Sequence, residues 1–356
     1  MVMKKLNIVG LFQGLLLFLI FWTAKKPLEF LLNGVSNDLI YLVGAALMVF
    51  TIVVSLILLK LDNSGAAIFQ LLIMLIFLPI ALTHGNEFGA YKAFSLVLML
   101  NLMGIVFLIN RLSFSIETIL LTMAGLFLFY GVISGIMAQL LGSSFQRGII
   151  GFNGPIVFGQ YMVLSFTIYL LYGHKLRGAM AFLLSLLSFS KGPFLGGLLA
   201  AYLTSRNKFQ LVLISLPFVA IAIWMVGFDY RVLTWLTHLN DLESLSALGS
   251  FSGRIGAYKQ SYYLLSESSL GVGLGAWSNF SNYKYPHNMF LEILVEMPLL
   301  LGVCLILFMC VVFYSIKDSH YRVLFAIFVF MALFSGSIID NRGPFFISML
   351  FLLSFS

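Results

Sequence analysis

The 356-residue chain is 61% hydrophobic and only 9% charged, and its mean hydropathy is +1.05. Ordinary soluble domains contain roughly 45–50% apolar and about 25% charged residues, so this composition excludes a water-soluble globular protein and predicts a polytopic membrane protein. The net charge of +7 does not indicate nucleic-acid binding, because the basic residues lie singly at the ends of apolar runs and form no stripe.

The amino terminus reads M-V-M-K-K and continues as an apolar run to about Ala24. This pattern resembles a signal peptide, but the run is long and no small-x-small cleavage site follows it. We therefore expect an uncleaved first helix with its amino terminus in the cytoplasm. Cys304 and Cys310 lie six residues apart in one apolar run, on different faces of a helix, and predict neither a disulfide framework nor a metal site.

Polar breaks divide the chain into about twelve apolar runs, most of them near the roughly 20 residues that cross a bilayer. The sequence thus predicts an all-α fold, with residues 1–356 forming one integral membrane domain. Two short runs meet at F-S-K-G-P-F, which allows a broken or re-entrant pair. The expected spans are 6–24, 38–59, 66–83, 92–110, 116–138, 154–172, 178–190, 192–204, 209–227, 289–316, 323–339 and 344–356.

The distribution of positive charge indicates the orientation in the membrane. With the amino terminus inside, ten of the twenty lysines and arginines fall in cytoplasmic loops, four in segment 228–288 and six elsewhere outside. A long loop translocates largely regardless of its charge, so the short loops decide, and they favour this orientation. Segment 228–288 is therefore expected to face away from the cytoplasm.

Three of the outside cations, Arg147, Lys191 and Arg342, lie at or near the outer ends of apolar spans. A lone cation there is costly unless it snorkels to the interface or meets an anionic partner. From the residues alone, both explanations stay open.

The external segment contains three patterns. Residues 231–245 carry apolar side chains at helical spacing and predict an amphipathic helix on the outer membrane surface. The stretch from Ser252 predicts a helix packed on the bundle through one stripe, with Arg254 beside it. That stripe comprises Ile255, Tyr258, Tyr262 and Leu265.

Gly271, Gly273 and Gly275 alternate after the second of these helices. They neither follow a β-strand nor open a Rossmann-type helix, which argues against a dinucleotide site. A tight turn is the preferred interpretation, and an anion site lined by their N–H groups is the alternative.

Residues 285–296 read Y-P-H-N-M-F-L-E-I-L-V-E, a polar start to an apolar helix. Pro286 can fix the approach to the helix, Asn288 can cap it, and Glu292 suits the positive end of its dipole. Glu292 and Glu296 share one helix face. They can orient His287, bind sugar hydroxyls or pair with an arginine, and we expect pairing.

Taken in order, these motifs resemble the signature region of the O-antigen ligase and O-antigen polymerase family. The resemblance rests on R-x-x-A-Y from Arg254, on G-V-G-L-G-A-W, and on H-N-M-F-L-E-I-L-V-E from His287. Upstream, R-G-I-I-G-F-N-G-P from Arg147 resembles that family's arginine-plus-asparagine motif and includes Asn153. S-K-G-P-F-L-G-G resembles its S-R-G segment, with Lys191 in place of arginine and hence without a bidentate fork. The matches cover roughly residues 140–300.

The resemblance implies a helical, GT-C-like glycosyltransferase fold in the bacterial cytoplasmic membrane. It implies transfer of a glycan from a polyprenyl pyrophosphate carrier on the outer face, with a chain-length regulator and a flippase as partners. A lipid pyrophosphate is already a good leaving group, so the enzyme needs cations for the developing charge and a base for the acceptor hydroxyl. Arg147 and Arg254 suit the cationic role, with Lys191 and Arg342 as further candidates, and His287 suits the base.

No metal or other cofactor is expected. Many glycosyltransferases hold a metal through neighbouring carboxylates, but the only close external pair, Asp241 and Glu243, fits the solvated face of the predicted surface helix. Three functions remain: a polymerase acting on lipid-linked repeat units, a ligase acting on lipid A core or protein, and a lipid-linked oligosaccharide transporter. The compact chain favours the polymerase, and the absence of repeated halves argues against the transporter.

Overall fold

The computed structural model describes residues 8–23, 37–83, 87–109, 115–140, 155–186, 188, 190–205, 250–281, 286–333, 337–338 and 340–353. Within these ranges the chain forms fourteen α-helices and no β-strand, which confirms the predicted all-α class. The helices are α1 (Ile8–Thr23), α3 (Asn37–Lys60), α4 (Ser64–Thr83), α5 (Glu87–Ile109), α6 (Ile116–Leu140), α7 (Pro155–Leu171), α8 (Lys175–Leu186), α9 (Lys191–Thr204), α13 (Ser250–Glu267), α14 (Trp277–Phe280), α15 (Met289–Glu296), α16 (Leu299–Ser315), α17 (Ser319–Ala332) and α18 (Gly343–Leu353).

Four helices are long and apolar enough to cross a membrane, namely α3, α4, α5 and α6. Six further apolar helices of 10–17 residues accompany them in the described part of the chain. The structure thus supports a membrane protein with four candidate spans, a smaller number than the sequence predicts. The expected span at 209–227 lies outside the described residues.

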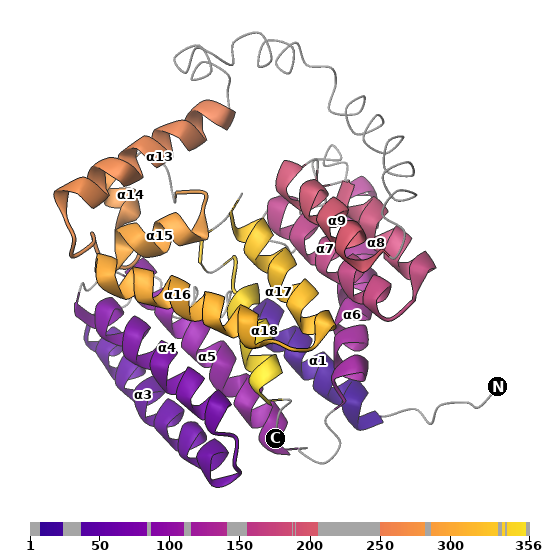
Figure 1. Cartoon of the computed structure of the whole chain (residues 1–356), viewed down its shortest axis with the longest axis horizontal. Helices are drawn as coiled ribbons and strands as arrows, with labels where there is room; N and C mark the ends of the chain where they lie inside the picture. Colours follow the sequence, from indigo (N-terminus) through magenta and orange to yellow (C-terminus); the bar gives the residue numbers. More distant parts are fainter. Residues whose placement is uncertain are drawn as a thin grey trace.

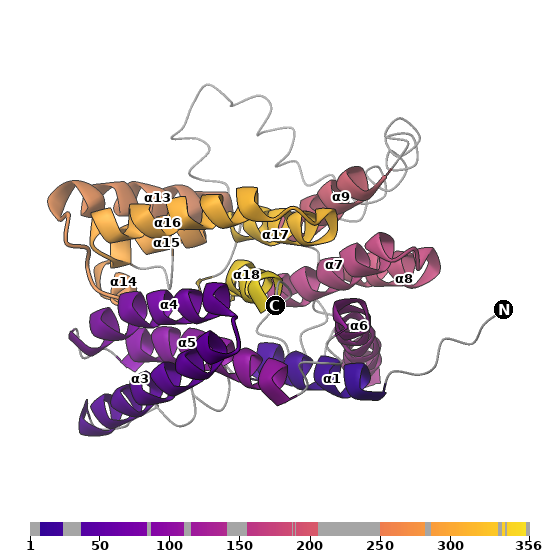
Figure 2. The ribbon, with the colours of Figure 1, turned by 60° about the horizontal axis from the view of Figure 1, so that its bottom comes forward.

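Six of the described helices form two groups, which are joined by the pair α17 and α18 and also by α1 and α6 (Figures 1 and 2). One group contains α3, α4 and α5, and the other contains α7, α8 and α9. Between them, α18 contacts α4 and α5, while α17 contacts α7 and α9. Helices α13, α14 and α15 gather beside the start of α16, where they form one end of the molecule (Figure 1).

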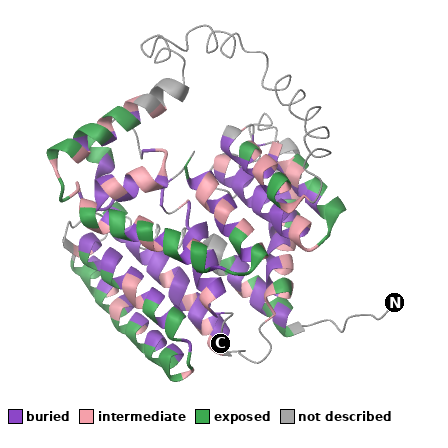
Figure 3. Cartoon of the chain, in the orientation of Figure 1, coloured by how far each residue is buried: buried purple, intermediate pink, exposed green. Residues whose placement is uncertain are grey.

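The central and peripheral helices differ in how far their apolar side chains are buried. Helix α18 is apolar on almost every side, and all of its residues except Leu352 are buried (Figure 3). A helix that is hydrophobic all round needs apolar surroundings on every side. On α3, in contrast, Leu42, Val49 and Leu56 are about 60% exposed, an arrangement suited to lipid rather than water.

The expected span at 289–316 is wrong as a single helix. The chain breaks at Met297 and Pro298, so that α15 ends at Glu296 and α16 starts at Leu299. Proline disfavours the helical conformation of the residue before it, and Met297 accordingly has an extended backbone (φ −109°, ψ 160°). The break separates the polar residues of α15 from the apolar α16.

The break predicted at F-S-K-G-P-F is confirmed, because α8 and α9 are separate helices on either side of it. Gly159 of α7 lies directly against this break. A Cβ atom on Gly159 would lie 2.6 Å from Ser188 Oγ and 2.7 Å from Pro193 Cβ, so only glycine permits the approach.

The stripe predicted for the helix after Ser252 is wrong at its two tyrosines, although Leu265 is partly buried and packed, and the Ile255 side chain lies outside the described residues. Tyr258 and Tyr262 of α13 are 39% and 77% exposed, whereas Ala257, Ser261 and Leu264 are buried. The small side chains of Ala257 and Ser261 allow close packing, and the amphipathic tyrosines stay outside. The predicted surface helix at 231–245 lies outside the described residues.

Candidate functional site

The start of α15 has the cap that the sequence predicts. The Asn288 side-chain oxygen accepts hydrogen bonds from the backbone N–H groups of Phe290 (2.9 Å) and Leu291 (3.2 Å). This cap binds two of the N–H groups that have no partner within the helix and fixes the point at which the chain enters it.

His287, immediately before the cap, has a left-handed backbone with φ of +61°. Within the described residues only Asp62 shares this feature among the non-glycine residues. Such a conformation is uncommon for a side chain with a Cβ atom and persists where its surroundings hold it, often at functional sites. The His287 side chain is half-buried.

Arg254 of α13 lies close enough to His287 to affect its charge. Burial lowers the pKa of His287 below its usual value, and the positive charge of Arg254 lowers it further. The imidazole is therefore neutral at pH 7 and able to accept a proton. Arg254 itself is partly exposed.

Glu292 and Glu296 are ion-paired, as expected, but their partner is a lysine and not an arginine. Lys92 of α5 donates to Glu292 Oε1 and to both oxygens of Glu296, at 2.8 Å (Oε1) and 2.7 Å (Oε2). All three side chains are 1% exposed. We call these three residues the Lys92 cluster.

Two backbone N–H groups complete the Lys92 cluster. Ile338 donates to Glu292 Oε2 at 2.7 Å, and Gly275 donates to Glu296 Oε2 at 2.9 Å. Two carboxylates face one ammonium, and these backbone dipoles offset part of the remaining negative charge. The cluster consequently joins α5, α15, the glycine turn and the segment before α18.

The glycine-rich stretch forms the predicted turn, with positive φ at Gly271, Gly273 and Gly275. The alternative interpretation is an anion site lined by N–H groups. The Gly275 N–H does bind an anion, but this anion is the Glu296 carboxylate of the protein itself. A Cβ atom on Gly89 of α5 would lie 2.0 Å from the Leu274 carbonyl oxygen. This backbone contact brings the amino-terminal end of α5 against the turn, and Lys92 lies about one helical turn further along α5.

A second polar group lies between α7 and the start of α18. Gln160 donates to Asn341 Oδ1 at 3.2 Å, and the Arg342 guanidinium is hydrogen-bonded to Tyr161. Arg342 is only 2% exposed. Ligand binding by Arg342 therefore requires access from within the bundle rather than from the surface.

The same stretch of α7 contacts both cationic helix starts. Gly159 lies against the α8–α9 break, and the next two residues, Gln160 and Tyr161, contact Asn341 and Arg342. The two segments share a pattern that sequence reasoning missed: S-K-G-P-F at 190–194 and N-R-G-P-F at 341–345. This repeated pattern, a cation followed by Gly-Pro-Phe, could have predicted that the two segments have related positions in the fold.

The remaining predicted site residues are only partly accounted for. Lys191 is the first residue of α9, but its side chain lies outside the described part of the structure. Arg147 and Asn153 also lie outside it, as does the carboxylate pair Asp241 and Glu243. Among the predicted site residues that the structure does describe, Arg254 lies near enough to His287 for its charge to lower the pKa of the imidazole.

Lys92 is the residue near the site that sequence reasoning missed. It is a lone cation at the start of an apolar run, and the cost argument applied to Arg147, Lys191 and Arg342 applies to it equally. This cost predicts that Lys92 has an anionic partner, but it does not identify that partner.

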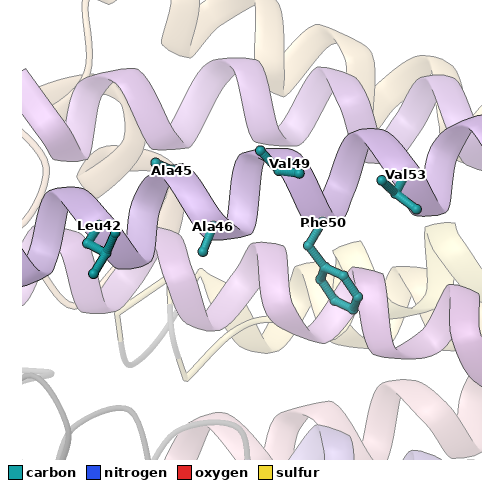
Figure 4. Close-up of a pocket in the computed structure, with 6 residues that line it drawn as sticks. All are labelled: Leu42, Ala45, Ala46, Val49, Phe50 and Val53. Atoms are coloured by element: carbon teal, nitrogen blue, oxygen red, sulfur yellow. The ribbon is translucent and has the colours of Figure 1, made fainter.

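The described structure also contains an open apolar groove on α3, lined by Leu42, Ala45, Ala46, Val49, Phe50 and Val53 (Figure 4). None of these side chains can take a proton or bind a charge. The groove is therefore not a candidate for proton transfer or for binding an anionic group.

No protein-family model, curated protein sequence or solved structure matches the chain. The resemblance to the O-antigen ligase and polymerase family accordingly rests on the motifs alone, and the function that follows from it is a proposal.

Proposed function

We propose that the protein is a membrane glycosyltransferase that lengthens a bacterial surface polysaccharide. It moves a glycan from a polyprenyl pyrophosphate carrier onto a lipid-linked repeat unit at the outer face of the cytoplasmic membrane. The observation that carries this proposal is the half-buried His287 at the capped start of α15, with its left-handed backbone and with the cation Arg254 near enough to lower its pKa. These are the base and the anion-binding group that such a transfer needs.

The proposed reaction is a single displacement at the anomeric carbon of the donor sugar. The acceptor hydroxyl oxygen forms a bond to this carbon as the bond from the carbon to the pyrophosphate oxygen breaks. His287 takes the hydroxyl proton, and the departing pyrophosphate keeps the electron pair. Arg254 stabilises the developing negative charge with a fork of N–H donors that a lysine does not have.

The other cations extend the proposed donor site. Arg147 and Asn153 enter through the sequence motif, and Lys191 and Arg342 enter because their helix starts meet the same turn of α7. In this scheme the side-chain cations neutralise the pyrophosphate. Glu292 and Glu296 do not contact substrate, because both are fully buried against Lys92.

The proposal includes a full membrane arrangement beyond the four long helices. About twelve spans form one domain with a GT-C-like fold, and α13–α15 lie at its outer end. This places the base and the arginines in the leaflet where a translocated lipid pyrophosphate is found.

The test is glycan transfer by the purified protein in lipid nanodiscs, with a polyprenyl-pyrophosphate-linked repeat unit as both donor and acceptor. A ladder of longer lipid-linked glycans is the expected product. Product only in the presence of lipid A core would make the protein a ligase with the same donor chemistry. Movement of the lipid-linked unit across the bilayer without any transfer would replace the proposal with a transporter.

A further inference from the structure

We propose that Lys92 is a positioning residue. It holds the proposed base, His287, in a fixed position relative to residues 337–342, which we call the Arg342 segment. This inference rests on the proposed glycan transfer, in which His287 acts on the acceptor hydroxyl and Arg342 on the departing pyrophosphate. Lys92 touches neither substrate nor either of these residues. Its effect passes through the carboxylate of Glu292.

Glu292 connects Lys92 to both parts of the proposed site. Glu292 Oε1 accepts from Lys92, and Glu292 Oε2 accepts from the backbone N–H of Ile338 at 2.7 Å. Within α15, the backbone N–H of Glu292 donates to the Asn288 carbonyl at 3.0 Å, one residue after His287. On the other side, Ile338 lies four residues before Arg342, and Ser337 accepts a hydrogen bond from the Asn341 side chain. One carboxylate therefore links both halves of the proposed site.

Lys92 is also connected to the glycine turn, through Glu296. Its ammonium binds both oxygens of Glu296, and Glu296 in turn holds the Gly275 N–H of the turn. The ammonium lies 5.0 Å from the centre of the Phe88 ring, a cation–π contact within α5. Because the Gly89 backbone touches Leu274, Lys92 is fixed relative to the turn by contacts that leave little freedom.

The chemical composition of the cluster favours positioning over simple stabilisation. Three charged groups at 1% exposure carry a large desolvation cost, and well-packed apolar residues of the same volume often give equal or greater stability. What the ions provide is directional bonding, because all four carboxylate oxygens accept hydrogen bonds from donors at defined positions. A displacement of about 1 Å at a reacting group can lower the rate about 100-fold.

The decisive variant replaces all three charges together: Lys92→Met with Glu292→Gln and Glu296→Gln. It leaves no unpaired buried charge, and the glutamine oxygens can still accept from Ile338 and Gly275. We expect a folded protein with donor binding within about threefold of the wild type and a kcat lowered about 100-fold. Hydrogen exchange should increase in peptides covering 286–297 and 337–342.

The matched control is Asn101→Leu, which removes a buried polar contact from the same helix. Asn101 donates to Thr51 Oγ1 at 2.8 Å and is 0% exposed, but it has no contact with the site. It should lower stability without changing kcat or the exchange of those two peptides. Comparison of the two variants separates a general loss of packing in α5 from a loss of position.

The outcomes distinguish this inference from the function on which it rests. Wild-type kcat and exchange in the triple variant would overturn the positioning role. If the wild type itself transfers no glycan, the proposed function fails, while the exchange measurement still tests the link between α15 and the Arg342 segment. If the triple variant does not fold, Glu292→Gln alone, which leaves a balanced Lys92–Glu296 pair, must show the kcat loss at unchanged donor KM. An unchanged kcat in that variant would also overturn the inference.

Discussion

Lys92 and Glu296 form a buried ion pair with 2.7 Å between Nζ and Oε2, although 204 residues separate them in the sequence. The pair connects the amino-terminal part of α5 to α15, the helix that follows His287. The amino-terminal third of the chain, which has no motif in common with the family it resembles, therefore contributes directly to the candidate site.

The role of His287 as the base can be tested with a residue that keeps hydrogen bonding but cannot take a proton. We expect His287→Gln to abolish transfer while binding of the lipid pyrophosphate donor persists, because the base acts on the acceptor. Transfer and donor binding are measured on the same purified sample. Substantial turnover by this variant would leave His287 with an orienting role only.

The pH dependence of transfer should reflect the lowered pKa of His287. A base works in its neutral form, so activity should fall as the pH drops through the His287 pKa, below the usual value of about 6.5. Arg254→Met removes one of the two causes of the shift and should move this acid limb to higher pH in the remaining activity. An acid limb that does not move would show that the limb belongs to another group.

The same shift affects stability. The unfolded chain binds a proton at His287 at a higher pH than the folded chain does, so stability falls as the pH drops below about 6.5. Thermal unfolding of His287→Gln and of the wild type between pH 5 and pH 8 checks the sign, since the wild type should lose more stability on acidification.

The cap of α15 should matter for function as well as stability. Asn288→Ala is expected to cost about 1 kcal/mol of folding free energy and to lower transfer, because it frees the chain next to His287. Asp318→Ala is the matched control: Asp318 caps α17 with two similar bonds, to His320 at 2.7 Å and Tyr321 at 3.3 Å. Its loss should lower the unfolding temperature similarly and leave kcat unchanged. Equal kcat in the two variants would contradict a special role for the α15 cap.

The close contact between α5 and the glycine turn predicts opposite effects of alanine at two helical glycines. Gly89→Ala should destabilise the protein by about 1–3 kcal/mol, because its Cβ atom would lie 2.0 Å from a backbone oxygen. Gly125→Ala, whose Cβ atom would meet only Tyr169 Oη at 3.5 Å, should be neutral or stabilising. The unfolding temperature of each purified variant is the measurement, and a stable Gly89→Ala variant would refute the contact.

The orientation in the membrane can be tested with single cysteines. Cys304 and Cys310 are both exposed on α16, so they are first replaced by alanine. In that background, Ser266→Cys should react with an impermeant thiol reagent in intact cells, and Lys60→Cys should not. Both positions are exposed. Labelling of Lys60→Cys alone would put the candidate site on the cytoplasmic side.

The features that could be predicted from the sequence are those that depend on composition or on neighbouring residues. Composition predicts a membrane protein, and the structure has four helices able to span a bilayer. The Asn288 cap, the turn at Gly271–Gly275 and the break between α8 and α9 are all local, because each depends on the backbone preferences of a few adjacent residues. The break before Pro298 follows the same kind of rule and could have been predicted.

Contacts between residues far apart in the chain could not be predicted, because they depend on how the helices pack. Helical spacing relates residues three or four positions apart, so it pairs Glu292 with Glu296 but cannot select Lys92 as their partner. The face of α13 was wrongly predicted for a similar reason: tyrosines suit both a packed and an exposed surface, and the contact with α15 selects the small residues instead. The cost of burying a lone charge requires that a partner exist, but its identity depends on how the helices come together.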